Sequence, residues 1–344
     1  MTTSSVAERP ARGFHRAGVW VPVTAVTLAV AVAAVFTETP GSASVAVVVV
    51  VAALGIPHGA VDHLAAAALG GPFDTSSPRR FARDYLLAML GVGVLWLVAP
   101  TVALAGFLVV SVHHFGQSDL AYLGLPPGRA VAVQWSRGLL LVGLPLVAHV
   151  ESAGPVIERL GGGDPASWAW LADWWILWSA VLVVQHVAIG WALTHGDIDR
   201  PTLAREAVTA AALTALFLTA DPLIGFAVYF GLWHSFAHLF VLGDLIGTGP
   251  APLRSVVGLA APLTAVSLLG IAVVVGGAVA AGRTDLIVPL TFVFVSMLTV
   301  PHLFVVERIW GARAGDVVSA PAQDGTPTPT TGTPNRSRTG GGPS

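Results

Sequence analysis

Long apolar runs alternate with short polar breaks along most of the chain. The runs approach or exceed the roughly 18 residues that an α-helix needs to cross the hydrocarbon core of a bilayer. Set against the charged breaks, they predict about ten transmembrane spans. These spans cover residues 19–36, 43–69, 84–99, 101–123, 130–150, 171–194, 203–220, 222–243, 256–281 and 286–308. The pattern therefore predicts an all-α fold, a polytopic integral membrane helix bundle.

Arginine positions orient this bundle. The breaks on one side and both flanks hold most of the arginines, whereas the opposite breaks hold only Arg159 and Arg283. The larger set is Arg9, Arg12, Arg16, Arg79, Arg80, Arg83, Arg129, Arg200, Arg205, Arg254, Arg308 and Arg313. Because cytoplasmic loops are enriched in basic residues, we expect a multi-pass cell-membrane protein with both termini in the cytoplasm. The outer loop after Glu151, with the sequence "GGGDPASW", is long enough for an interfacial helix.

Composition excludes several classes of protein. The chain is 54% hydrophobic and only 10% charged, whereas a soluble domain is about a quarter charged. It has no cysteine, which excludes disulfides, thiolate catalysis and cysteine-bound metals. The net charge is −2, and no nucleic-acid partner is expected. We expect residues 1–315 to form a single transmembrane domain. Residues 316–344, rich in Pro, Thr, Gly and Ser, should form a disordered cytoplasmic tail.

Histidines gather at one predicted depth. The spans with even numbers in chain order contain His58, His114, His186, His234, His238 and His302. Each lies about 12 to 16 residues into its span, and at roughly 1.5 Å of rise per residue these positions nearly coincide in depth. Ionisable side chains inside a bilayer are costly and normally face the bundle interior or a cavity. The layer therefore predicts a shared centre rather than scattered packing residues.

Two local motifs sharpen this prediction. In "WHSFAH", His234 and His238 are four residues apart, so both rings share one helix face and could hold one metal ion. In "GIPHGAVDHL", His58 and Asp62 have the same spacing. Asp62 could accept a hydrogen bond from His58 or orient another ligand histidine. His63 should point away from that face and is not expected to bind the same ion.

The remaining motifs are weaker. In "VHHFGQSDL", adjacent histidines on a helix cannot both face one centre, so His114 is favoured over His113. Asp119 in the same motif is expected to be solvated, and Glu307 near the end of the last span to be interfacial. His186 has no accompanying signal and is interpreted either as a packing residue or as a residue that supports a metal ligand. Neutral imidazoles with almost no carboxylate suit Fe(II), Cu or Zn rather than Mg or Ca.

The motifs "GIPHGAVDH", "HHFGQSD", "WHSFAH" and "VPHLFVVE" occur in this order between His58 and Glu307. Together they resemble the bacteriorhodopsin-related-protein-like (Brp/Blh) family of membrane β-carotene 15,15′-dioxygenases. The resemblance implies a helical membrane enzyme that binds Fe(2+) through four histidines and splits the central double bond of β-carotene with O2, which yields two retinal molecules.

Carried over residue by residue, the resemblance implies that the metal ligands are His58, His114, His234 and His238. His302 matches a family-typical Pro-His pair and, with Asp62, is expected to support the ligands rather than bind the ion. One departure is Ala237, where the family commonly has Arg. The substrate is therefore expected to be β-carotene or a related carotenoid.

The expected partners follow from this chemistry. They are the carotenoid, O2, membrane lipid and a microbial rhodopsin as a possible acceptor of retinal. A long polyene needs an apolar and aromatic tunnel, and the aromatic residues beside the histidine motifs are candidates for its lining. They are Phe115, Tyr229, Phe230, Trp233 and Phe236.

Other functions stay open on sequence alone. The histidine layer could be the pathway of an intramembrane metal-ion or proton transporter. The outer halves of the even-numbered spans are nearly all apolar, which counts against a pathway across the membrane. A di-iron desaturase or hydroxylase would need further histidine boxes. A haem protein and a structural rhodopsin-assembly factor are further alternatives.

Overall fold

The computed structural model describes residues 14, 18–37, 51–70, 73, 75–164, 169–194, 196, 198–246 and 252–319. Within these residues every regular element is helical, and there is no strand. The α-helices are α2 (Trp20–Phe36), α4 (Asp62–Leu69), α5 (Pro78–Val98), α6 (Pro100–Leu120), α7 (Pro127–Ala148), α8 (Val150–Ile157), α9 (Ala169–Asp173), α10 (Trp175–Thr194), α11 (Arg200–Thr219), α12 (Pro222–Val228), α13 (Ser235–Leu245), α14 (Pro252–Ala280) and α15 (Ile287–Ser319).

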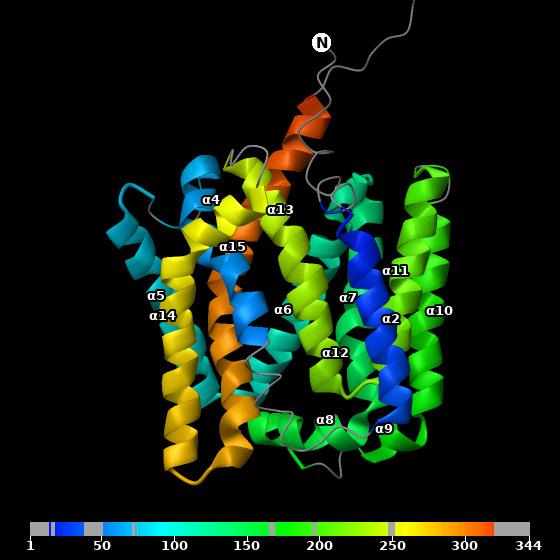
Figure 1. Ribbon diagram of the computed structural model, residues 1–344, viewed down its shortest axis with the longest axis horizontal. Helices are drawn as coiled ribbons and strands as arrows, with labels where there is room; N and C mark the ends of the chain where they lie inside the picture. The colour runs from blue at the N-terminus through cyan, green and yellow to red at the C-terminus, as the bar shows by residue number, and fades with distance from the viewer. Residues whose placement is uncertain are drawn as a thin grey trace, which may run out of the picture.

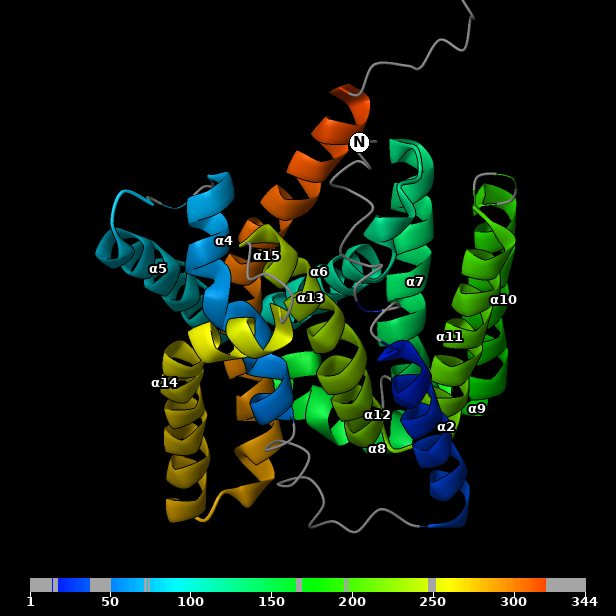
Figure 2. The ribbon, with the colours of Figure 1, turned by 45° about the horizontal axis from the view of Figure 1, so that its top comes forward.

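The long helices form two groups that flank a central pair of segments. In Figure 1, α5, α14 and α15 lie on one side and α2, α7, α10 and α11 on the other, with α6, α12 and α13 between them. The contacts agree with this view, because α5 packs on α15 and α13 on α14, while α7 packs on α6 and α10 and α2 on α11. Figure 2 shows the same arrangement after a 45° turn. The middle of the bundle is therefore where distant parts of the chain meet.

Seven helical segments of the described residues are long and apolar enough to cross a membrane. They are Pro78–Val98, Pro127–Ala148, Trp175–Ala192, Arg200–Thr219, Pro222–Leu245, Arg254–Ala280 and Thr284–Gly311. Large apolar side chains such as Leu97, Leu269 and Val273 are exposed on these helices, as expected for surfaces that face lipid. A multi-pass helix bundle is thus confirmed, and the count of ten spans stays a prediction.

The other predicted spans differ from these seven. Helix α2 is apolar but has only 17 residues, and α6 has 21 residues with a polar C-terminal half. The predicted span 43–69 lies partly outside the described residues. Its described part is not one α-helix, because a π-helical turn (η2, Val51–Gly55) and a 3₁₀-helix (η3, Ile56–Val61) precede α4. Helix α15 runs past the predicted end at residue 308 to Ser319, and residues 320–344 lie outside the described part.

One end of the bundle is closed by the loop predicted to be outside. The short helix α8 lies across this end (Figure 1), as expected for an interfacial helix. Arg159 Nε lies 3.3 Å from Asp285 Oδ2, and Arg283 Nε lies 3.1 Å from Asp285 Oδ1. Both arginines assigned to the outer side thus meet at one end, as the predicted topology requires.

Helices α6 and α7 cross with their backbones in contact. A Cβ on Gly138 would lie 1.8 Å from the carbonyl oxygen of Val112, and a Cβ on Gly116 would lie 1.8 Å from that of Gln134. Small residues allow such close approach between membrane helices. Because His114 lies between Val112 and Gly116 on α6, this crossing fixes the height and rotation of that histidine.

We predict that Gly138→Ala destabilises the protein by about 1–3 kcal/mol or more, because an overpacked backbone contact forces the helices apart. The matched control is Gly106→Ala, on α6 at a position where a Cβ meets nothing within 4 Å. The measurement is the unfolding free energy in mixed micelles. Equal stability of the two variants would contradict the close crossing.

Candidate metal centre

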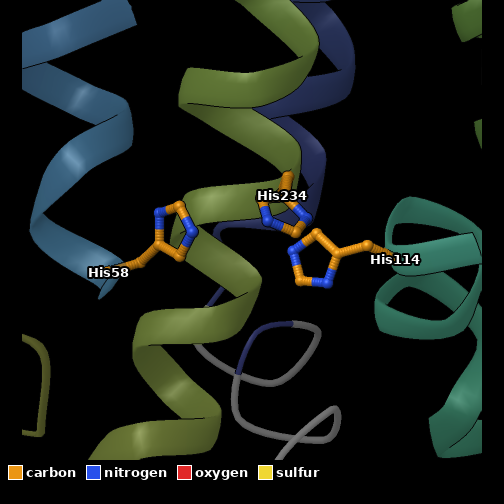
Figure 3. Close-up of side chains that lie close together, drawn as sticks. All are labelled: His58, His114 and His234. Carbon is orange, nitrogen blue, oxygen red and sulfur yellow. The ribbon is translucent and has the colours of Figure 1, made fainter. Parts of the chain in front are cut away.

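Five buried imidazoles converge in the middle of the bundle. His58 comes from η3, His114 from α6, His234 from the π-helical turn Tyr229–His234 (η7), His238 from α13 and His302 from α15. Their exposed fractions are 5% or less. One nitrogen from each of His58, His114 and His234 lies within 4.8 Å of the other two. Figure 3 shows these three rings turned toward one another from three separate segments.

Ring distances show that all five belong to one cluster. The centroid of the His58 ring lies 4.9 Å from His234, 5.5 Å from His238 and 4.9 Å from His302. His114 lies 4.9 Å from His234 and 5.2 Å from His302. His238 lies 5.3 Å from His302. The rings of His234 and His238 are parallel within 12°, with centroids 6.2 Å apart, so the predicted shared face is confirmed.

Two departures from α-helical geometry build this cluster. The π-helical turns η2 and η7 pack against each other. At Gly55 a Cβ would lie 1.9 Å from the ring of Phe230, and at Gly231 it would lie 3.1 Å from Leu54. Pro57 then opens the 3₁₀-helix that holds His58, since proline has no N–H to continue the preceding helix. Because of the wider π turns, His58 and His234 face each other across this contact.

Hydrogen bonds orient two of the rings through Nδ1. His58 Nδ1 contacts the carbonyl oxygen of Gly55 and lies 3.2 Å from Ser235 Oγ. His302 Nδ1 lies 2.9 Å from both carboxylate oxygens of Asp62. Of the two roles that the sequence left open for Asp62, the structure therefore supports the second, in which it orients another histidine.

Several ring nitrogens of the cluster are buried without a hydrogen-bond partner among the described residues: His114 Nδ1, both nitrogens of His234 and His302 Nε2. An unpaired buried polar group costs about 1–3 kcal/mol. Lone pairs on neutral imidazoles are ligands for Fe, Cu or Zn. The donor set and its unsatisfied nitrogens therefore fit a transition-metal ion.

Among the described residues, His63 and His113 lie outside the cluster, as predicted, and so does His186, although it belongs to the predicted histidine layer. His113 Nε2 is 2.6 Å from Glu307 Oε1, His186 Nδ1 is 2.9 Å from Ser136 Oγ, and the His63 ring lies against Phe81. The expectation that Asp119 is merely solvated was wrong. Its carboxylate accepts a hydrogen bond of 2.9 Å from Tyr229, because α6 and η7 adjoin there.

Sequence reasoning missed a second buried polar group. Arg137 on α7 is 1% exposed, and its Nη2 lies 2.6 Å from Glu206 Oε2 on α11. Tyr122 also donates a hydrogen bond to Glu206. The available signal was a lone arginine, Arg137, inside one apolar span and an acidic residue, Glu206, near the start of another. Ala237 lines a small cavity beside Tyr122 and Glu206.

An apolar cavity of about 950 Å³, its open mouth included, adjoins the cluster. Its walls come from α6, α7, α8 and α12, with Leu104, Phe107, Leu141, Ala153, Val156 and Phe226 among the lining residues. Phe115 and Tyr229 line it as well, and Phe115 lies 5.0 Å from the His234 ring. Two of the five aromatic candidates thus face the cavity.

The other three aromatic candidates make contacts away from the cavity. Phe230 stacks on His234 at 13° and 5.6 Å. Trp233 donates a hydrogen bond of 2.9 Å to Thr27 on α2. Phe236 packs against the core formed by α2, α7 and α11. None of the three is among the residues that line the large cavity.

Comparisons with known proteins indicate one family. The family model described as "Beta-carotene 15,15'-dioxygenase" matches residues 49–310. The chain is 29% identical over 296 residues to "Probable beta-carotene 15,15'-dioxygenase Blh" of Halobacterium salinarum, which covers 75% of this chain and 82% of that protein. It is 27% identical over 272 residues to "Beta-carotene 15,15'-dioxygenase" of uncultured marine bacterium 66A03, which covers 75% of this chain and 90% of that protein. No solved structure gives a significant match.

Proposed function

The chain belongs to the β-carotene 15,15′-dioxygenase family, and we propose that it cleaves the central double bond of β-carotene, or of a related carotenoid, with O2. Each of the two carbons receives one oxygen atom, so one polyene and one O2 give two molecules of retinal. The balance requires no proton and no external reductant. The observation that carries the proposal is the buried imidazole cluster beside an apolar cavity.

We propose Fe(2+) as the resident metal, with His58, His114, His234 and His238 as its minimum ligand set. Iron bound there would supply the position at which O2 is bound and activated. The support is the burial of these rings and their mutual distances. Asp62 would offset part of the ion's charge, because its carboxylate is 2% exposed and lies one side chain away from the cluster.

We propose the apolar cavity as the site of the polyene. A carotenoid dissolves in the bilayer and can enter an apolar cavity from the side, where shape rather than hydrogen bonding selects it. Phe115 both lines the cavity and contacts His234, so a chain held there would end near the metal ligands. The depth of insertion would then decide which double bond meets O2.

The cellular setting follows as part of the same proposal. Seven long apolar helices support a place in the cell membrane, and we retain ten spans with both termini in the cytoplasm. Retinal formed there would leave into the lipid and could be taken up by a microbial rhodopsin. The transporter alternative receives less support, because side chains lining the cavity beside the histidines are almost all apolar.

Expression in a β-carotene-producing bacterium tests the reaction. With the wild type, we predict loss of yellow colour and appearance of retinal. With His234→Ala, we predict that retinal formation falls by more than about 100-fold. Removal of a residue that only orients a metal ligand lowers activity by about 10–100-fold, and removal of a ligand should cost more. His63→Ala is the control, since that ring lies outside the cluster. No retinal from the wild type, or undiminished retinal from His234→Ala, would contradict the proposal.

Helix α8 offers a test of the cavity. Ala153→Phe would fill the side of the cavity formed by α8, and we predict a fall in kcat/KM of roughly 10- to 100-fold or cleavage away from the centre, because small misplacements cost this much. Glu151→Phe places the same ring on the exposed side of α8 and serves as the control. Products are separated by chromatography. Identical rates and products for the two variants would exclude this cavity as the polyene site.

A further inference from the structure

We propose that His302 is itself a ligand of the metal, bound through Nε2, with Asp62 and Tyr85 as the residues that position it. This inference rests on the metal centre of the proposed function and deepens it, because it adds a fifth imidazole to the four that the motifs suggest. The helix α15 would then take part directly in the centre rather than pack beside it.

The first argument is the position of the ring. With a metal–nitrogen bond of about 2.1 Å, the centre of a bound imidazole lies about 3.25 Å from the ion, so two rings about 90° to 110° apart have centres about 4.6 to 5.3 Å apart. His302 lies 4.9 Å from His58, 5.2 Å from His114 and 5.3 Å from His238. Three separations within this range place His302 in the same sphere as the other rings.

The second argument is its hydrogen bonding. An ionised carboxylate only accepts hydrogen bonds, so the 2.9 Å contact with Asp62 places the proton of His302 on Nδ1. The lone pair of a neutral ring is then on Nε2. That atom is buried and has no hydrogen-bond partner among the described residues. A lone pair turned away from Asp62, inside a cluster of imidazoles, is suited to a cation.

The third argument is a comparison within the cluster. His58 has Nδ1 on the carbonyl oxygen of Gly55, and His302 has Nδ1 on a carboxylate. Ligand histidines nearly always donate the second ring N–H to such an acceptor, which fixes the tautomer. A purely supporting histidine would instead hydrogen-bond to a ligand. Among the described residues, the hydrogen bonds of His302 lead to Asp62 and not to another ring of the cluster.

Tyr85 holds the Asp62 carboxylate in position. Its hydroxyl donates a hydrogen bond of 3.0 Å to Asp62 Oδ2, which connects α5 to α4 and, through His302, to α15. The carboxylate thus has donors on two sides and is held in one rotamer. Besides its charge, Asp62 acts on the metal by orienting His302, and Tyr85 acts by holding Asp62, so both are positioning residues.

Metal binding to the purified full-length protein tests the inference, with Co(II) as the spectroscopic probe. We expect His302→Ala to lower the affinity for Co(II) by more than about 100-fold and to change its d–d absorption, and Asp62→Asn to cost about 10- to 100-fold. Free imidazole should restore affinity and spectrum to His302→Ala, because it can occupy the space of the missing ring. His63→Ala is the matched control and should bind as the wild type does.

The outcomes separate the two proposals. Suppose that the wild-type protein binds Co(II) and forms retinal. If His302→Ala then has the same Co(II) affinity and spectrum as the wild type, this inference alone is overturned. A wild type that binds neither Co(II) nor Fe(II) would overturn both. If His302→Ala does not fold, His302→Gln keeps the bulk, and an unchanged affinity in that variant would equally contradict a ligand role. If His302→Ala lowers the affinity but leaves the spectrum of bound Co(II) unchanged, the ligand set is unchanged. That result would contradict a ligand role and leave His302 with a structural one.

Discussion

The burial of five imidazoles at one point of a membrane bundle is the constraint on which the rest of this structure depends. Each ring carries a lone pair that must be satisfied, and hydrocarbon offers no hydrogen bonds. The Nδ1 atoms of two rings have hydrogen-bond acceptors within the chain: the carbonyl oxygen of Gly55 for His58 and the carboxylate of Asp62 for His302. The inner nitrogens face one another, and one cation could satisfy several of them at once.

Irregular backbone makes this convergence possible. A π turn widens the helix and a 3₁₀ turn narrows it, and both are common at functional sites. Here η2 and η7 meet at the near-contact of Gly55 with Phe230, while Gly116 and Gly138 bring α6 against α7. Four of the five histidines come from segments that one of these two contacts positions. The apolar cavity lies beside the same segments, so the geometry that gathers the imidazoles also sets the position of any substrate held there.

The sequence predicted the parts of this account that depend on period and depth. Apolar runs gave most of the long helices within a few residues, and the shared depth of His58, His114, His234, His238 and His302 brought these residues together in advance. The i, i+4 rule placed His234 and His238 on one face, which the parallel rings confirm. Adjacent residues on a helix diverge, which separated His113 from His114.

The rest depends on contacts between distant segments, which periodicity does not encode. Asp62 meets His302 across 240 residues of sequence, and the pair of Arg137 with Glu206 spans 69. The π turns adjoin a tertiary contact at Gly55 that the sequence does not show, and only Pro57 marks the start of the 3₁₀ turn in the sequence. The part of the cavity formed by α8 could not be predicted either, because a loop gives no signal of the surface that it covers.

X-ray absorption at the iron edge of the isolated protein tests the central claim most directly. The account predicts one iron per chain, with a scattering pattern of four or five imidazole nitrogens near 2.1 Å, as neutral nitrogen ligands require. Iron bound mainly by oxygen ligands, or protein that takes up no iron although it is folded and forms retinal, would contradict it.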